Sequence, residues 1–300
     1  MRRTNHRPST TDLALLVLAA AAVSTSAPLV RAAAAPTLAI AFWRDALALP
    51  VVGGIVVTTQ RERLRRITKP EVRLSVVAGV LLALHFAAWV PSVSFTSVAS
   101  SVALVSTMPV WSAVIDRMRG EPVRTRAWAG IALALGGVVL LTGVDVTVSA
   151  RALFGDVLAL AGGVLAALYV HAGAEVRRTV STSIYASICY GAAAALLLVV
   201  CVVGGQELVG YPASTWLALL AITAGPQLLG HTVVNRVLAT TGPTVVSIMI
   251  LLEIVGATIL AWVFFDEAPP LLAYPAAAMI VAGVVAVVSA RTPSPEPLVA

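Results

Sequence analysis

The sequence predicts an all-α integral membrane protein with ten transmembrane helices arranged as a 5+5 inverted repeat. Three observations lead to this: an apolar composition, ten apolar runs of membrane length, and a likeness between the two halves of the chain. Hydrophobic residues make up 59% of the 300 residues and charged residues only 11%, with a mean hydropathy of +0.95. A soluble domain is roughly half apolar and about one quarter charged. The composition therefore excludes a soluble enzyme, a disordered protein and a secreted disulfide scaffold.

Ten apolar runs are each long enough to cross a hydrocarbon layer of about 30 Å as a helix. They lie at about 13–30, 36–58, 74–91, 97–115, 127–144, 156–174, 182–204, 215–235, 244–264 and 271–290. The connections between them are too short for a separate soluble domain. The expected organisation is a cytoplasmic tail (1–12), a first repeat (13–144), a second repeat (155–290) and a cytoplasmic tail (291–300).

The basic residues indicate how the chain is oriented. With ten spans and a cytoplasmic N-terminus, 17 of the 20 Arg and Lys residues lie in cytoplasmic segments. Only Arg31 and Arg151 are then outside, and Arg44 lies within the second span. This bias is the positive-inside pattern, so the net charge of +6 indicates membrane orientation and not a nucleic-acid partner. The alternative, a cleavable signal peptide containing 13–23, would leave nine spans.

The two halves of the chain contain similar segments. The matching stretches are 96–123 with 128–141 and 242–270 with 274–288. Aligning Glu121 with Glu267 also aligns Gly137 with Gly283. Because each half has five spans, the halves must insert with opposite orientation, an architecture typical of secondary transporters with a binding site between the repeats.

Several segments carry a resemblance to a known family. They are IAFWRDALAL around Arg44, LHFAAW with FTSVASS and MPVW, GD…ALY at 155–169, PQLLGH…N at 226–235 and LLEIVGATILAWVFFDE at 251–267. The chain resembles the EamA-type permeases of the drug/metabolite transporter superfamily, which have two EamA domains. The resemblance implies proton-linked or facilitated export of small metabolites such as amino acids, nucleobase-like compounds or drugs. It also implies a central cavity lined by the first four helices of each half, with the fifth helix peripheral.

The chain departs from the family pattern at three places. Alanines at 19–22 replace a Trp-Gly pair, Ala166 replaces a Trp, and Ile254 replaces a Pro. These changes suggest a cavity with fewer aromatic walls than in relatives.

Polar side chains within the spans are the candidate substrate-binding residues, because unpaired polar groups are costly in a bilayer. His85 and Trp89 share one helix face, and Gln227, His231 and Asn235 share another at i, i+4 spacing. Trp111 and Tyr169 are candidate cavity walls. The alternative for each is a hydrogen bond between helices that only holds the bundle together. For His171, a local pair with Glu175 is the preferred interpretation.

Two ionisable residues have a separate expected role. Glu253, near the middle of the ninth run, is either a proton-coupling acid or a structural one. Arg44, next to Asp45, either binds a substrate carboxylate or forms an ion pair between helices.

The predicted function is a secondary transporter, an exporter of small metabolites working by alternating access in the plasma (inner) membrane. The chain has no GxxxxGK[ST] loop for ATP, and no cofactor or metal is expected. Its expected partners are a small-molecule substrate, the lipid bilayer and protons as coupling ion, and the sequence leaves room for a homodimer. The alternatives are a membrane receptor or scaffold and an integral-membrane lipid-modifying enzyme.

Overall fold

The computed structural model describes residues 8–92, 94–96, 98–142, 149–265 and 271–290, and every regular element among them is a helix. Most of both predicted tails and Glu267 of the repeat alignment lie outside the described residues. The first half contains α1 (Thr10–Ser24), α2 (Ser26–Ala32), α3 (Thr37–Thr59), α4 (Arg61–Arg65), α5 (Lys69–Ser92), α6 (Val98–Val105), α7 (Met108–Met118) and α8 (Thr125–Thr142). The second half contains α9 (Ala150–Val176), α10 (Thr182–Val203), α11 (Ala213–Ile222), the π-helix η1 (Thr223–His231), α12 (Thr232–Val237), α13 (Pro243–Ile250), α14 (Leu252–Phe265) and α15 (Ala273–Ser289).

Six helical segments are long and apolar enough to cross a membrane, which makes this a multi-pass membrane protein. They are Thr10–Val30, Thr37–Thr59, Lys69–Ser92, Ala150–Val176, Thr182–Val203 and Ala213–Val237. The remaining runs form shorter or interrupted helices, so the prediction of ten spanning helices is confirmed only in part.

Two of the interruptions have causes that the structure shows. Pro109, the second residue of α7, cannot donate a backbone hydrogen bond to α6, while the Thr107 hydroxyl donates to the Leu104 carbonyl at 2.6 Å. Between α13 and α14 there is no proline, and Ser24 of α1 donates instead to the Glu253 carbonyl at 2.9 Å. A hydroxyl from another helix thus bonds the backbone at the point where α14 begins.

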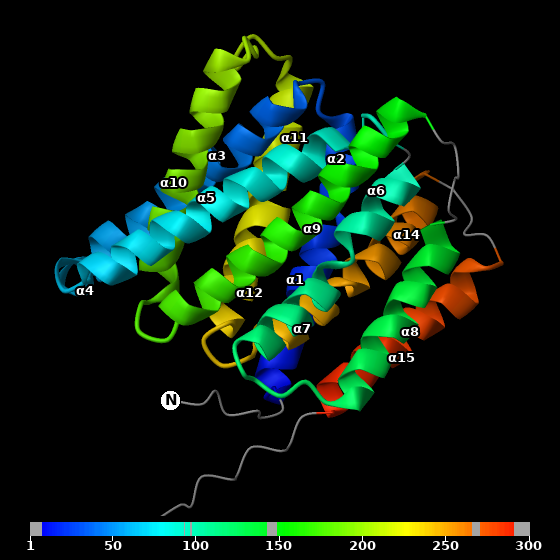
Figure 1. Cartoon of the computed structure of the whole chain (residues 1–300). Coiled ribbons are helices and arrows are strands. Elements are labelled where there is room, and N and C mark those ends of the chain that lie inside the picture. Colours follow the sequence, from blue (N-terminus) through cyan, green and yellow to red (C-terminus); the bar gives the residue numbers. More distant parts are fainter. Residues whose placement is uncertain (1–7, 93, 97, 143–148, 266–270, 291–300) are drawn as a thin grey trace, which may run out of the picture.

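The helices pack in two clusters that each combine both halves of the chain. We call α5, α6, α7 and α9 the α5/α9 cluster, and α1, η1, α12, α13 and α14 the α1/η1 cluster. The pair α3–α10 contacts both clusters along one side, and the pair α8–α15 contacts both along another. Figure 1 shows α8 and α15 side by side at the edge of the molecule. The last helix of each half is therefore peripheral, as the family resemblance implies.

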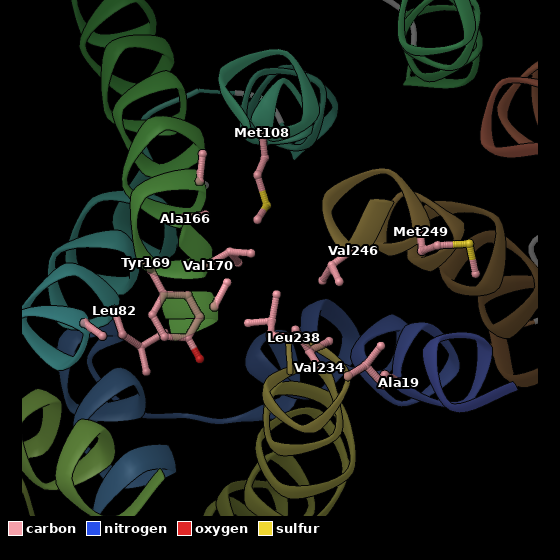
Figure 2. Close-up of a cluster of buried hydrophobic side chains, with 14 of the residues drawn as sticks. Ala19, Leu82, Met108, Ala166, Tyr169, Val170, Val234, Leu238, Val246 and Met249 are labelled. Carbon is pink, nitrogen blue, oxygen red and sulfur yellow. The ribbon is translucent and has the colours of Figure 1, made fainter. Parts of the chain in front are cut away.

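Side chains from both clusters meet in a common apolar core. Figure 2 shows Leu82, Met108 and Val170 of one cluster near Val246 and Ala19 of the other. All are buried, and most are small or β-branched. Small side chains allow helices in a bilayer to approach closely, where van der Waals contact is the main source of association.

The α8–α15 pair depends on glycines that face one another. A Cβ built on Gly283 would lie 2.5 Å from the Gly130 carbonyl oxygen, and one built on Gly130 would lie 2.8 Å from the Gly283 carbonyl oxygen. About two turns further along α8, a Cβ on Gly137 would lie 2.6 Å from the Ala276 carbonyl oxygen. The two backbones therefore touch directly, and both glycines matched by the repeat alignment lie at this contact.

We expect Gly283→Ala to destabilise the protein by about 1–3 kcal/mol, because the added methyl group forces the two helices apart. Thermal unfolding in detergent, followed by circular dichroism, measures the effect. Gly54→Ala is the matched control, since a Cβ at Gly54 meets nothing within 4 Å and alanine favours the helix. Equal melting temperatures for the two variants would contradict this account of the α8–α15 contact.

Candidate functional site

Three buried polar side chains from α3 and η1 form the centre of the site. The Arg44 Nε donates to the Gln227 Oε1 at 2.9 Å, and the Gln227 Nε2 donates to the Asp45 Oδ1 at 2.6 Å. Arg44 is 1% exposed, and Asp45 and Gln227 are fully buried. One amide therefore bonds a cation and an anion that are neighbours on α3, and it connects the two halves of the chain.

Of the two roles expected for Arg44, the ion pair between helices is not formed in the described part of the chain. Among the described residues, no carboxylate lies within ion-pair distance of its guanidinium, and Gln227 is its hydrogen-bond partner. Neighbours on a helix point about 100° apart. Arg44 and Asp45 are therefore linked to each other through the Gln227 amide, which bonds both. The π-helical turn that contains Pro226 and Gln227 decides which way the amide points.

Aromatic rings and an imidazole lie against this centre. The Arg44 guanidinium carbon is 4.0 Å from the centroid of the Phe86 ring. The Phe86 ring meets His231 edge-on, with centroids 5.5 Å apart, and His231 lies 6.3 Å from the Tyr169 ring. The structure thus brings together residues that the sequence placed in four separate runs.

His85 and Trp89 share a helix face as predicted. Their rings are parallel within 3°, with centroids 6.1 Å apart. The His85 Nδ1 donates to the Gly162 carbonyl of α9 at 2.9 Å, and a Cβ on Gly162 would lie 3.1 Å from the Trp89 Cβ. One nitrogen of His85 therefore forms a hydrogen bond between helices, which was the structural alternative for this residue, and its ring stacks on Trp89.

Asn235 joins α12 to α9. The Tyr169 hydroxyl donates to its Oδ1 at 2.9 Å, and the Arg177 Nε donates to its backbone carbonyl at 2.9 Å. Both Tyr169 and Asn235 are buried. Two of the predicted site residues are thus partners of each other across the two clusters.

Trp111 and Glu253 take different positions from this group. The Trp111 indole donates to the Thr107 hydroxyl at 3.0 Å, next to the interruption between α6 and α7. The Glu253 side chain stays partly exposed, while its backbone carbonyl is held by Ser24. Glu253 is therefore joined to α1 through its backbone carbonyl.

Four buried polar atoms have no hydrogen-bond partner within the described part of the chain and lie on residues of this site. They are the Arg44 Nη2, the Asp45 Oδ2, the Trp89 Nε1 and the Asn235 Nδ2. Buried polar groups are normally hydrogen-bonded. These atoms give the site unused donors and an unused acceptor for a polar ligand.

A second polar group joins α7, α9 and α13. The His171 Nε2 lies 3.1 Å from the Asp116 Oδ1, and the Thr244 hydroxyl donates to the other oxygen of Asp116 at 2.5 Å. One turn away, the hydroxyls of Ser112 and Ser247 are 2.7 Å apart. All five side chains are buried. The contacts of Thr244 with Asp116 and of Ser247 with Ser112 cross from the α1/η1 cluster to the α5/α9 cluster, while that of His171 with Asp116 lies within the α5/α9 cluster.

The expected local pair of His171 with Glu175 is wrong. Glu175 bonds Arg178 at 3.1 Å, and His171 bonds Asp116. The His171 Nδ1 donates to the Ala167 carbonyl, so its Nε2 is the nitrogen that faces the Asp116 carboxylate. The Asp116 carboxylate of α7 reaches the buried face of α9 that carries His171, and Glu175 instead pairs with Arg178.

Sequence reasoning also missed Asp116 and Phe86. Asp116 follows directly after the fourth predicted run, next to Arg117 and Arg119, and reads there as part of a charged connection. Phe86 is one more apolar residue in an apolar run. A signal existed for Asp116 alone, since α7 carries it on the same face as Ser112, one helical turn earlier.

Comparison with known proteins gives a family match and a fold match. The sequence model of the EamA-like transporter family matches residues 11–143 and 153–289, one copy in each half. A protein of known crystal structure shares the fold with a TM-score of 0.79 and 20% sequence identity, over 94% of this chain and 99% of its own. At that identity the similarity shows the fold alone. No curated protein matches the chain.

We expect Gln227→Leu to destabilise the protein by about 1–3 kcal/mol, because it leaves Arg44 and Asp45 buried without their shared partner. Leucine is similar in size, so the loss reports the missing amide. Thermal unfolding in detergent provides the measurement. Gln206→Leu, in the connection after α10 where the side chain bonds only the Gly204 carbonyl, should change the melting temperature little. A Gln227 variant as stable as the wild type would show that the amide is not required.

Proposed function

The chain belongs to the EamA-like transporter family, and from this premise we propose that it is a secondary transporter that exports small metabolites by alternating access. The observation that carries the proposal is the polar site described above, with unused hydrogen-bonding atoms, between two helix clusters. A site of this kind at the interface of two repeats is where transporters of this architecture bind substrate.

We also propose ten membrane spans, formed when interrupted helices count together. The joined helices are α1 with α2, α6 with α7, α11 with η1 and α12, and α13 with α14. The packing supports an inverted repeat over 13–144 and 155–290, because the main contact of one half has a counterpart in the other: α5 on α9 corresponds to η1 and α12 on α1.

Two hydrogen bonds support the same repeat. The Thr96 hydroxyl donates to Asp156 at 2.7 Å, and the Thr240 hydroxyl donates to Asp12 at 3.1 Å. The second threonine lies 144 residues after the first, and the two aspartates are also 144 residues apart. Each bond ties the connection before the fourth span of one half to the start of the first span of the other.

The proposed orientation has both termini in the cytoplasm, with the plasma membrane as the location. The basic connections contact one another at one end of the molecule, as this orientation requires. The Thr179 hydroxyl donates to Glu71 at 2.6 Å, and Arg124 donates to the Ala290 carbonyl at 2.9 Å. Clustered Arg and Lys residues favour the cytoplasmic face.

In the proposed mechanism, the contacts of Ser112 with Ser247 and of Asp116 with Thr244 close the cytoplasmic end. They join α7 to α13, which belong to different clusters. Access from the cytoplasm requires these contacts to break while the clusters rock about the central site. His231, Tyr169, Phe86 and Trp89 then contact the substrate, and Glu253 carries the coupling proton.

Transport by purified protein in proteoliposomes tests the site. The substrate panel is amino acids, nucleobases and cationic dyes, with and without an imposed pH gradient. We expect His231→Ala to lower transport at least about tenfold, equivalent to ~1.4 kcal/mol, while the protein stays folded. We expect Glu253→Gln to keep counterflow and lose the response to the gradient. Glu207→Gln, in an extramembrane connection, is the matched control. Normal transport and normal gradient response in both variants would reject the site.

Cross-linking tests the proposed closure at the cytoplasmic end. In a background of Cys189→Ala and Cys201→Ala, oxidation of Ser112→Cys/Ser247→Cys should join α7 to α13, stop transport, and be reversed by reduction. The matched control is Ser92→Cys/Ser101→Cys, because those hydroxyls are 2.6 Å apart within the α5/α9 cluster. Its cross-link should leave transport intact. Inhibition by both pairs, or by neither, would contradict the proposed motion between clusters.

A further inference from the structure

A basic pocket lies away from the central site, between α4, the start of α5 and the connection from α9 to α10. Its charged lining consists of Arg63, Arg66, Glu71, Arg177 and Arg178. Ile67, Val180 and Ile184 supply apolar wall. Four cations and one anion therefore face a single hollow.

The one carboxylate of the lining is already occupied. One Glu71 oxygen accepts from the backbone N–H and the hydroxyl of Thr68, each at 2.8 Å, and the other accepts from the Thr179 hydroxyl at 2.6 Å. In the described part of the chain, neither Arg63 nor Arg66 pairs with a carboxylate. Arg178 pairs with Glu175 at 3.1 Å, so the positive charge that the pocket presents without a carboxylate partner among the described residues is that of Arg63, Arg66 and Arg177.

Arg177 adds a partly buried cation to the same hollow. Its guanidinium donates to the carbonyls of Asn235 and Val180. Burial lowers the pKa of this guanidinium from its ordinary value, and Arg236 lowers it further while Tyr185 opposes the change. A cation that lacks water and faces other arginines is stabilised by a bound anion.

The walls of the pocket are held by hydrogen bonds between distant segments. Thr179 bonds Glu71 of α5, and the Ser181 hydroxyl donates to the Gln60 side chain between α3 and α4. The connection from α9 to α10 is thus tied to both ends of the connection from α3 to α5. The walls of the pocket are therefore held in place by hydrogen bonds between segments.

A second, shallower groove runs along the first turns of α5. It is lined by Lys69, Pro70, Arg73, Leu74 and Val77. Its lining passes from two cations to apolar side chains over nine residues, in the direction in which α5 enters the membrane. Long basic side chains at such a level lie along apolar surface and hold their charge at the headgroup layer.

We propose that this basic pocket binds the phosphate of an anionic phospholipid. The shared chemistry is a phosphate group held by Arg63, Arg66 and Arg177, with Arg178 beside them. A lipid fits better than free phosphate because the pocket lies at the ends of the membrane-spanning helices α5, α9 and α10. Basic pockets at the cytoplasmic side of transmembrane helices bind such headgroups.

The test measures lipid binding by the purified full chain, so its result does not depend on transport. Native mass spectrometry at fixed ionic strength compares phosphatidylglycerol with phosphatidylcholine. For Arg63→Gln/Arg66→Gln, the affinity for phosphatidylglycerol should fall at least about tenfold, since each arginine near the surface contributes to anionic lipid binding. Phosphatidylcholine should bind weakly to every variant. Arg177 stays unchanged because it also bonds Asn235.

The matched control is Arg65→Gln/Arg119→Gln, which removes the same charge from exposed positions outside the pocket lining. It should bind phosphatidylglycerol as the wild type does. Equal losses in the two double variants would reduce the effect to general charge attraction and overturn the proposal. Inorganic phosphate should not displace the lipid at millimolar concentration. If it does, and the arginine dependence persists for phosphate alone, the pocket is a free-anion site and the lipid assignment is wrong.

Discussion

The arrangement of the whole bundle depends on one amide between two buried charges. Arg44 and Asp45 lie in an apolar interior, where an ion without partners is strongly destabilised. Gln227 accepts from one and donates to the other. Since Gln227 belongs to the second half and the two charged residues belong to the first, Arg44 and Asp45 gain this shared partner only when the halves are docked. The same requirement places Phe86 and His231 against the guanidinium.

Around this centre, the two clusters are interlocked because each contains one helix from the other half. The helix α9 of the second half packs with α5, α6 and α7, and α1 of the first half packs with η1, α12, α13 and α14. The α5/α9 cluster and the α1/η1 cluster meet through α7, α9, α12 and α13, where the polar contacts of Ser112 and Asp116 lie. Glycines and alanines allow the helices to approach closely, as between α8 and α15. Such an architecture favours motion of whole clusters over changes within one helix, because the contacts within each cluster are the closer ones.

Some of the candidate site could be predicted because it repeats along one helix. His85 and Trp89 are four residues apart on α5, and their rings stack as that spacing predicts. The partner of His171 could not be predicted in this way. Asp116 comes from α7, and no pattern within the ninth helix indicates which neighbour its buried face will meet. The π-helix that orients Gln227 could not be predicted from the sequence either. Pro226 marks the segment, but its apolar pattern does not distinguish a π-helix from an α-helix.

The membrane environment, the helical class, the family and the two-part repeat can all be read from the amino-acid sequence. Each of these follows from properties that add up along the chain: apolar content, run length, basic residues in connections and internal similarity. Helix packing, in contrast, sets where helices break, which side chain bonds both Arg44 and Asp45, and which contacts join the clusters. Those outcomes depend on distances between residues far apart in sequence. A periodic pattern states which face of a helix is polar, and packing alone decides what that face meets.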